Sequence, residues 1–282
     1  MTARDIGALA YGALMEEVSA TPKPGLVDRR NSGAHSDMDC NTFAASALAL
    51  RPHFEAFART GERLRHASEP ELLAALRPMG LAAEADMYQA TNGVNTHKGA
   101  VFSLGLLCAA AGWRTAQGLD LQPTSVCGTV AAMTAGLSAE LAGAGDGTAG
   151  ARMFRLHGVL GARGEAESGF ASARAHGLPI LKAGLKRGDD RNTACVRALM
   201  ALMGAVTDTN VLNRHDMEAA LWLRAEARRV LGRFSLEAVA ALDDALIARN
   251  ISPGGCADLL AVTLMLHGLT DLGALPQAPQ TF

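Results

Sequence analysis

The strongest constraint on the fold is the near absence of residues that build buried β-strands. Isoleucine occurs at only four of the 282 positions, and no run of β-branched residues marks a strand. Alanine and leucine supply most of the apolar residues, which make up 49% of the chain, while aromatic residues make up 4%. A core of such small side chains suits helices that approach one another closely. The sequence therefore predicts an all-α protein.

Apolar residues recur at helical spacing along most of the chain. No repeat, low-complexity tract or linker divides it, so we expect residues 1–282 to form a single compact multi-helix domain. Pro78 predicts a break within its helix, and Asp216 and Ser235 are placed to act as N-caps. The predicted helices cover about residues 4–19, 40–59, 69–90, 97–112, 124–142, a segment that starts near Glu165, 190–206, 216–231, 235–249 and 255–270.

Charge and hydropathy exclude several classes of partner. The net charge is −2 and no Lys/Arg stripe carries interleaved aromatic residues, which argues against nucleic acid. The N-terminal segment lacks the apolar stretch of a signal peptide, and the longest uncharged apolar run, Gly99 to Trp113, is too short to span a bilayer. Five cysteines are scattered without a CxxC pair, as in proteins of a reducing compartment. We expect a cytoplasmic protein with no membrane partner.

Two long connections carry many of the polar residues. Residues 20–39 and 143–164 place glycines, carboxylates and cations between strongly apolar helices. Connections between helices are usually short, and long ordered loops often hold a functional site on a rigid scaffold. We therefore expect the active site in these long inter-helix loops.

Two short motifs have simpler explanations than their best-known meanings. GDGTAG, at residues 145–150, matches the letters of the dinucleotide fingerprint, but it follows an alanine-rich helix instead of a strand and is predicted to be a flexible loop. Residues 214–216 read Arg-His-Asp and contain the dipeptide of metal-dependent HD phosphohydrolases, which need further ligands from other helices. Asp216 is better explained as a helix cap.

The stretch NGVNTHKG, residues 92–99, stands where an apolar helix begins. Asn95 or Thr96 can cap this helix, which leaves its first backbone N–H groups and Lys98 beside the preceding loop. A helix N-terminus with an added ammonium group is suited to bind phosphate. A solvated lysine beside an ordinary cap explains the same residues equally well.

Carboxylates gather with cations at other helix ends. Each carboxylate alone is typical of a solvated surface, but several of them, completed by waters and substrate phosphates, can hold Mg²⁺. The first long loop holds Lys23, Asp28, Arg29, Arg30, His35, Asp37 and Asp39. The later clusters hold Glu84, before NTHKG, and Arg163 with Glu165 and Glu167.

A tight turn, Pro253-Gly254-Gly255, precedes the last apolar helix, whose first turn carries Asp258. A carboxylate that interacts with the helix dipole explains Asp258 without any ligand. The functional interpretation is a glycine backbone that a ligand can approach closely, with Asp258 facing the same cavity.

These motifs together resemble the signature segments of the triphosphoribosyl-dephospho-CoA synthases, which are found with citrate lyase and malonate decarboxylase. The segments span positions 21 to about 261, nearly the whole chain, and His215 departs from the family pattern, which has glycine there. In order, the matching segments are TPKPGLVDRRNSGAHSDMD, GVNTHKG, GARGEAESGF, DTNVLNRHD and NISPGGCADLLA.

The resemblance implies an all-helical enzyme that transfers the triphosphoribosyl part of ATP to the 2′-hydroxyl of 3′-dephospho-CoA and releases adenine. The product would pass to a prosthetic-group transferase that modifies an acyl-carrier subunit. The alanine-rich composition and the lack of a fused second domain favour malonate decarboxylase over citrate lyase as the end user. An apolar helical enzyme of this size is also compatible with a homodimer.

The family reaction breaks an N-glycosidic bond and keeps the triphosphate, so it needs a base, a proton donor and phosphate ligands. We expect Asp28 or Glu167 as the base, and His35 or His97 as a proton donor or phosphate ligand. Mg²⁺ would be ligated by Asp37, Glu84 and Glu165. Substrate and phosphate contacts would come from Lys23, Arg29, Asn95, Thr96, His97, Lys98, Arg163, Ser252, Gly254, Gly255 and Asp258.

Two other functions fit the same residues. One is a Mg²⁺-dependent helical hydrolase that cleaves the N-glycosidic bond of a nucleotide or ADP-ribose-type substrate, which predicts adenine release without dephospho-CoA. The other is a non-catalytic helical nucleotide-binding scaffold, which predicts ATP binding without turnover.

Overall fold

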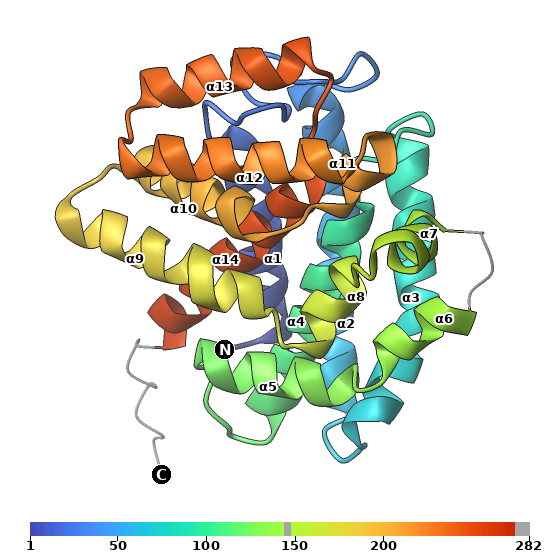
Figure 1. Ribbon diagram of the computed structural model, residues 1–282. Helices are drawn as coiled ribbons and strands as arrows, with labels where there is room; N and C mark the ends of the chain where they lie inside the picture. The colour runs from blue at the N-terminus through green and yellow to red at the C-terminus, as the bar shows by residue number, and fades with distance from the viewer. Residues whose placement is uncertain (144–147, 274–282) are drawn as a thin grey trace.

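The computed structural model describes residues 1–143 and 148–273, which form helices and no strand (Figure 1). The prediction of an all-α protein is confirmed. In chain order the α-helices are α1 (Ala3–Ser19), α2 (Cys40–Arg63), α3 (Glu69–Ala90), α4 (Lys98–Ala116), α5 (Pro123–Met133), α6 (Glu140–Gly143), α7 (Ala149–His157), α8 (Gly161–Glu167), α9 (Leu178–Arg187), α10 (Arg191–Ala205), α11 (Thr209–Arg214), α12 (Met217–Gly232), α13 (Leu236–Ala248) and α14 (Gly254–Gly273). A 3₁₀ turn, η1 (Leu137–Ala139), precedes α6, and a π-helical turn, η2 (Ala173–Gly177), precedes α9.

Helices α1, α2, α4 and α14 form the centre of the molecule, where α2 contacts both α4 and α1 and α14 contacts α1. Small residues allow α2 and α4 to cross closely. A Cβ atom on Gly61 would lie 2.1 Å from the carbonyl oxygen of Ala109, and one on Gly112 would lie 2.1 Å from that of Ala58. The two helices therefore meet backbone to backbone, and neither glycine can be replaced without moving them apart.

Helix α4 is the most apolar element of this centre. Among the described residues it has the length and composition to cross a membrane, as does the bent pair formed by Pro123–Met133 and Leu137–Gly143. However, 67% of the apolar window of α4 is buried inside the protein. The helix is longer than the apolar run in the sequence because it begins at Lys98 and continues through Arg114 to Ala116. Its burial is that of a core helix.

The structure confirms both predicted N-caps. The Asp216 carboxylate accepts a hydrogen bond from the Ala219 N–H, and the Ser235 hydroxyl accepts one from Ala238. The predicted break at Pro78 is wrong, since α3 continues through it. Pro78 is exposed, so the carbonyl group that its missing N–H leaves without a helical partner can face water.

Two other predictions are wrong at the boundaries of the elements. The helix predicted over 124–142 ends at Met133, because Gly136 adopts a left-handed conformation with φ 78° and the chain restarts in η1. The long loop predicted over 143–164 contains α7 and the start of α8. Half of the GDGTAG motif, residues 145–147, lies outside the described residues, and Thr148 caps α7.

Candidate active site

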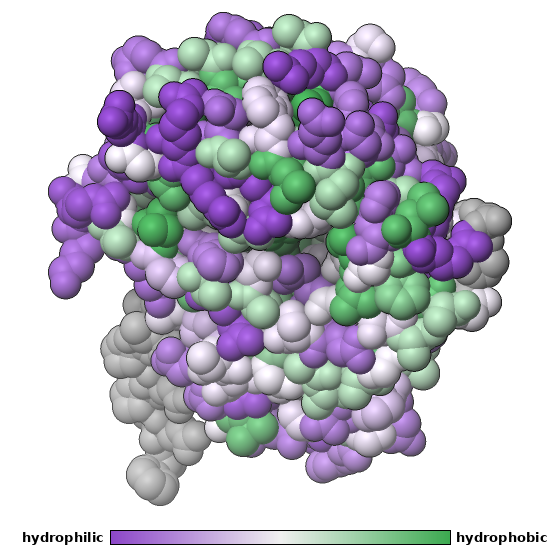
Figure 2. All heavy atoms as spheres, viewed as in Figure 1, coloured by the Kyte–Doolittle hydropathy of each residue, from purple (hydrophilic) through white to green (hydrophobic). Residues whose placement is uncertain are grey.

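A cavity of about 1180 Å³ opens between the first long loop, α3, α4, α8 and the N-terminal ends of α11 and α14. Figure 2 shows the surface hollowed between α8 and α11, with apolar residues beside the hollow. The walls come from helix ends as much as from loops. Fourteen of the residues expected in the site line this cavity: Lys23, His35, Asp37, Glu84, Asn95, Thr96, His97, Lys98, Arg163, Glu165, Ser252, Gly254, Gly255 and Asp258.

Asp28, Arg29 and Glu167 do not line the cavity, and their contacts explain why. The Asp28 carboxylate is buried and accepts hydrogen bonds from three backbone N–H groups of its own loop, including that of Lys23 at 2.7 Å. Glu167 accepts hydrogen bonds from the N–H groups of Gly136 and Ser138 at the start of η1, which lower its pKa. Arg29 is exposed on another face, beside Asp28. The geometry therefore gives no support to Asp28 or Glu167 as the base, which stays a prediction, and Arg29 does not line the cavity.

The two cavity lysines already have carboxylate partners. Lys23 is buried and its Nζ lies 2.6 Å from Glu17 Oε1. Lys98 Nζ lies 2.7 Å from Glu84 Oε2, and this hydrogen bond raises the pKa of Lys98. Burial raises the pKa of Glu17 although the charge of Lys23 opposes the rise. A carboxylate partner therefore balances the charge of each lysine at the cavity wall, and neither lysine is a free cation.

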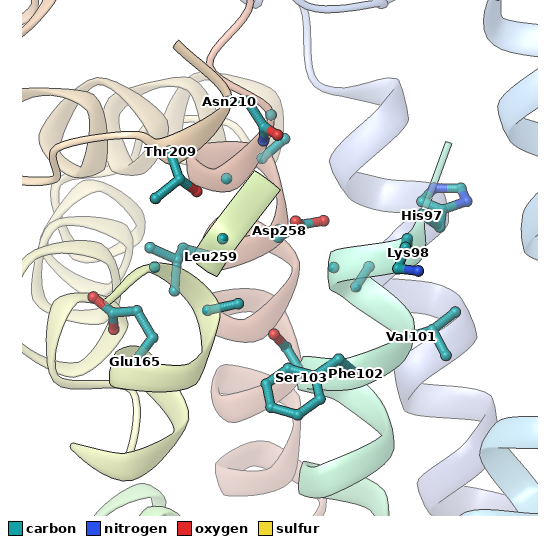
Figure 3. A pocket seen from close by; sticks show the side chains of 18 of the residues that line it. His97, Lys98, Val101, Phe102, Ser103, Glu165, Thr209, Asn210, Asp258 and Leu259 are labelled. Atoms are coloured by element: carbon teal, nitrogen blue, oxygen red, sulfur yellow. The ribbon is translucent and has the colours of Figure 1, made fainter. Parts of the chain in front are cut away.

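The N-terminus of α4, which the sequence suggested as a phosphate site, is occupied by protein side chains. The prediction that Asn95 or Thr96 is the N-cap is wrong, since His97 occupies that position without a side-chain capping hydrogen bond. Asn95 Oδ1 does accept a hydrogen bond of 3.3 Å from the Lys98 N–H. The Asp258 carboxylate lies against Gly99, where a Cβ atom would be 2.1 Å from Asp258 Oδ2. Figure 3 shows Asp258 reaching from α14 toward this end of α4. Its carboxylate, and not an open row of N–H groups, faces the cavity here.

His97 lies under the cavity as a buried, neutral imidazole. Its Nδ1 is 2.7 Å from Ser46 Oγ, which in turn accepts a hydrogen bond of 2.7 Å from Thr96 Oγ1. Its Nε2 has no partner among the described residues. Burial, assisted by the charge of Lys23, lowers the pKa of His97 to about 3. His97 can exchange a hydrogen bond with a ligand, but at neutral pH it carries no additional proton to give away.

A second histidine stands on the opposite side of the mouth, near the tight turn before α14. His35 Nε2 lies 2.8 Å from Ser252 Oγ, and His35 Nδ1 lies 3.7 Å from Asp37 Oδ1. Burial and the nearby charge of Arg214 lower the pKa of His35. Arg214 is exposed, lines the cavity and forms no hydrogen bond or ion pair with the described residues. In the sequence, Arg214 stands out only as part of the Arg-His-Asp motif. Its positive charge is the one sequence feature that could have indicated a place in the cavity.

Asp208 is a second cavity residue that the sequence did not point to. It is buried and lines the cavity, and its carboxylate accepts hydrogen bonds from the N–H groups of Asn210 and Cys256 at 2.8 and 2.9 Å. It therefore caps α11 and the start of α14 together, and it fixes the turn that contains Gly254 and Gly255. Its position directly before a short helix is the signal of an N-cap. The HD motif is structural by contrast, since His215 Nε2 lies 2.9 Å from the Asn250 carbonyl oxygen.

Comparison with known proteins identifies the family. The chain matches the ATP:dephospho-CoA triphosphoribosyl transferase family over residues 3–276. The protein belongs to this family. A relative named 2-(5''-triphosphoribosyl)-3'-dephosphocoenzyme-A synthase, from Pectobacterium atrosepticum, is 47% identical over 93% of this chain and 88% of its own length. Proteins named as probable synthases of the same kind, from Albidiferax ferrireducens and Salmonella gallinarum, are 48% and 43% identical over 95% and 94% of this chain and 91% of their own lengths. No solved structure gives a significant match.

In this member of the transferase family, the predicted metal ligands do not converge. Among the described residues, no three His, Cys, Asp or Glu side chains lie close enough to hold a metal ion. Asp37 is exposed at the rim, Glu84 is paired with Lys98, and Glu165 Oε1 accepts a hydrogen bond of 2.5 Å from Ser172 Oγ. Mg²⁺ commonly takes only one or two protein carboxylates and completes its shell with waters and phosphates.

Proposed function

We propose that this protein transfers the triphosphoribosyl group of ATP to the 2′-hydroxyl of 3′-dephospho-CoA and releases adenine. The observation that carries the proposal is one cavity of about 1180 Å³ lined by residues from all five sequence segments of the family resemblance. Pockets for a single small ligand typically occupy about 300–1,000 Å³. A larger cavity can hold a donor and an acceptor nucleotide together, which direct transfer requires and hydrolysis does not.

The cations that lack strong partners suit the triphosphate. Arg163 lines the cavity from α8, and its Nη1 lies 3.6 Å from Glu140 without a hydrogen bond to the described residues. Arg214 lies at the mouth with no ion pair to the described residues. Guanidinium groups bind phosphate oxygens in pairs of parallel hydrogen bonds. Mg²⁺ bound to ATP would neutralise further phosphate charge, and Asp37 and Glu84 are the cavity carboxylates that would hold it.

The base is reassigned to Glu165. It lines the cavity, whereas Asp28 and Glu167 do not, and Ser172 holds its two oxygens through the hydroxyl at 2.5 Å and the N–H at 3.2 Å. These hydrogen bonds fix the orientation of the carboxylate at the cavity wall. Glu165 would accept the proton of the 2′-hydroxyl as its oxygen attacks an oxocarbenium-like ribose carbon. The product would then pass to a separate transferase that modifies an acyl-carrier subunit.

The direct test is incubation of the protein with ATP, Mg²⁺ and dephospho-CoA, followed by mass spectrometry. We expect free adenine together with a triphosphoribosyl adduct of dephospho-CoA. Formation of ADP or pyrophosphate would contradict the proposal. Adenine release without dephospho-CoA would support the hydrolase instead, and ATP binding without turnover would support the scaffold.

Glu167, two residues from Glu165, provides a matched control for the role of Glu165 as the base. Glu165→Gln should lower the rate of adenine release by about 10²-fold or more, the usual contribution of a general base. Glu167→Gln should stay within about 3-fold of the wild type, because Glu167 binds backbone N–H groups outside the cavity. Steady-state kinetics on both variants, with circular dichroism to confirm folding, makes the comparison. Equal losses in the two variants would refute the assignment.

A further inference from the structure

Asp258 occupies a position that no ordinary surface carboxylate shares. It lies near the N-terminal end of α14, lines the cavity and points across the gap toward α4 (Figure 3). Gly99 is what makes room for it, since a Cβ atom there would lie 2.1 Å from Asp258 Oδ2. The N-terminal ends of two core helices, α4 and α14, therefore hold this carboxyl group in place at the cavity wall.

The groups that face Asp258 disfavour its ionised form. Two carboxylates approach it, Glu17 from α1, which is paired with Lys23, and Asp208 from the segment before α11. Burial, and then the charges of Glu17 and Asp208, raise the pKa of Asp258 well above its ordinary value. The Ala100 N–H, at the positive end of α4, opposes the rise without cancelling it. The surroundings therefore favour the protonated carboxyl group, the form that can donate a proton, over the carboxylate.

The other cavity groups that could donate a proton are neutral or already bonded to protein partners. His97 is neutral, and its Nδ1 is held by Ser46. Burial lowers the pKa of His35, and its Nε2 is held by Ser252. Among the carboxyl groups with a raised pKa, Glu17 is bonded to Lys23, and Asp208 accepts hydrogen bonds from three backbone N–H groups. Of the described cavity residues, Asp258 combines the acid form with a carboxyl group that no other side chain holds.

We propose that Asp258 is the general acid that protonates adenine as it leaves, an assignment that rests on the proposed transferase function. The C1′–N9 bond breaks and its electron pair moves to adenine, while the Asp258 proton goes to a ring nitrogen. The 2′-hydroxyl oxygen of dephospho-CoA forms the new bond to C1′. Glu165 takes the proton of that hydroxyl and later releases it to solvent, while Asp258 regains a proton from solvent, so adenine leaves neutral and no proton is gained or lost overall.

A nucleotide substrate whose purine can leave without being protonated distinguishes the role of a general acid from a merely structural role. N7-methylated ATP is such a substrate, because its purine is already cationic. With ATP, Asp258→Asn should lower the rate of adenine release by about 10²-fold or more. With N7-methylated ATP, the loss should be less than about 5-fold, since the step that the acid assists is absent. Asp37→Asn, which changes another cavity carboxyl group, should affect both donors equally.

A second measurement needs no analogue. The wild-type rate should fall as pH rises through the raised pKa of Asp258, and the residual activity of Asp258→Asn should lack this fall. Equal losses on the two donors, or an alkaline fall that persists in the variant, would overturn the assignment. If the wild type itself releases no adenine from ATP with dephospho-CoA, the proposed function fails instead.

Discussion

His97 is a residue whose burial couples folding to pH. Burial and the charge of Lys23 lower its pKa from 6.5 to about 3. As pH falls below 6.5 the unfolded chain binds a proton at this side chain, whereas the folded protein binds one only near pH 3. The unfolded state then holds more protons, so stability is lost as pH falls through this window.

Replacement of this histidine should remove that dependence. Between pH 7 and pH 5, the wild type should lose roughly 1–2 kcal/mol more free energy of unfolding than His97→Gln. The variant can be less stable at pH 7 because it changes the contact with Ser46, but the difference between the two proteins should shrink as pH falls. Urea unfolding at a series of pH values measures it. A difference that stays constant would show that His97 ionises normally.

The residues of the site were predictable by type, and their partners were not. Lys98 and Glu84 were both expected at the site, one for phosphate and the other for a metal ion, but the structure joins them in one ion pair. Asp28 and Asp258 look alike in the sequence, since each follows a proline–glycine turn. Backbone N–H groups surround the first, and the second faces the cavity. Such differences depend on contacts between segments far apart in the chain.

At the scale of the element, the crossing of α2 and α4 offers the sharpest test. Gly61→Ala should cost about 1–3 kcal/mol, because its Cβ would meet the Ala109 carbonyl oxygen and force the two helices apart. Gly12, exposed on α1, has nothing near its missing Cβ, and Gly12→Ala should stabilise the protein by about 0.5–1 kcal/mol. Chemical denaturation of both variants checks the opposite signs. If Gly61→Ala were as stable as Gly12→Ala, the close crossing would be disproved.

Helices were predictable where apolar spacing and a capping residue agreed, as at Asp216 and Ser235. The errors came from residues whose effect depends on exposure. Pro78 fits inside α3 because its side of the helix faces water, and Gly136 ends a helical segment because it adopts a left-handed conformation. Neither exposure nor φ can be read from one residue and its neighbours.

At the scale of the molecule, the described helices share one connected hydrophobic core, which includes Ile6 of α1, Leu107 of α4 and Leu266 of α14. That residues 1–282 form a single domain stays a prediction. A single domain should unfold in one cooperative transition. Calorimetry should show one peak, and ATP with dephospho-CoA at about 100 times their dissociation constants should add about 2.7 kcal/mol for each bound ligand. Two resolved peaks would indicate separate units.

The cavity takes walls from both ends of the chain, with Glu17 and Lys23 near the beginning and Asp258 near the end. During synthesis on the ribosome the first helices can fold long before α14 emerges. Until then one wall of the cavity, together with its acid, is missing. A chain whose synthesis has not yet reached α14 therefore lacks a closed cavity, and we expect it to release no adenine from ATP.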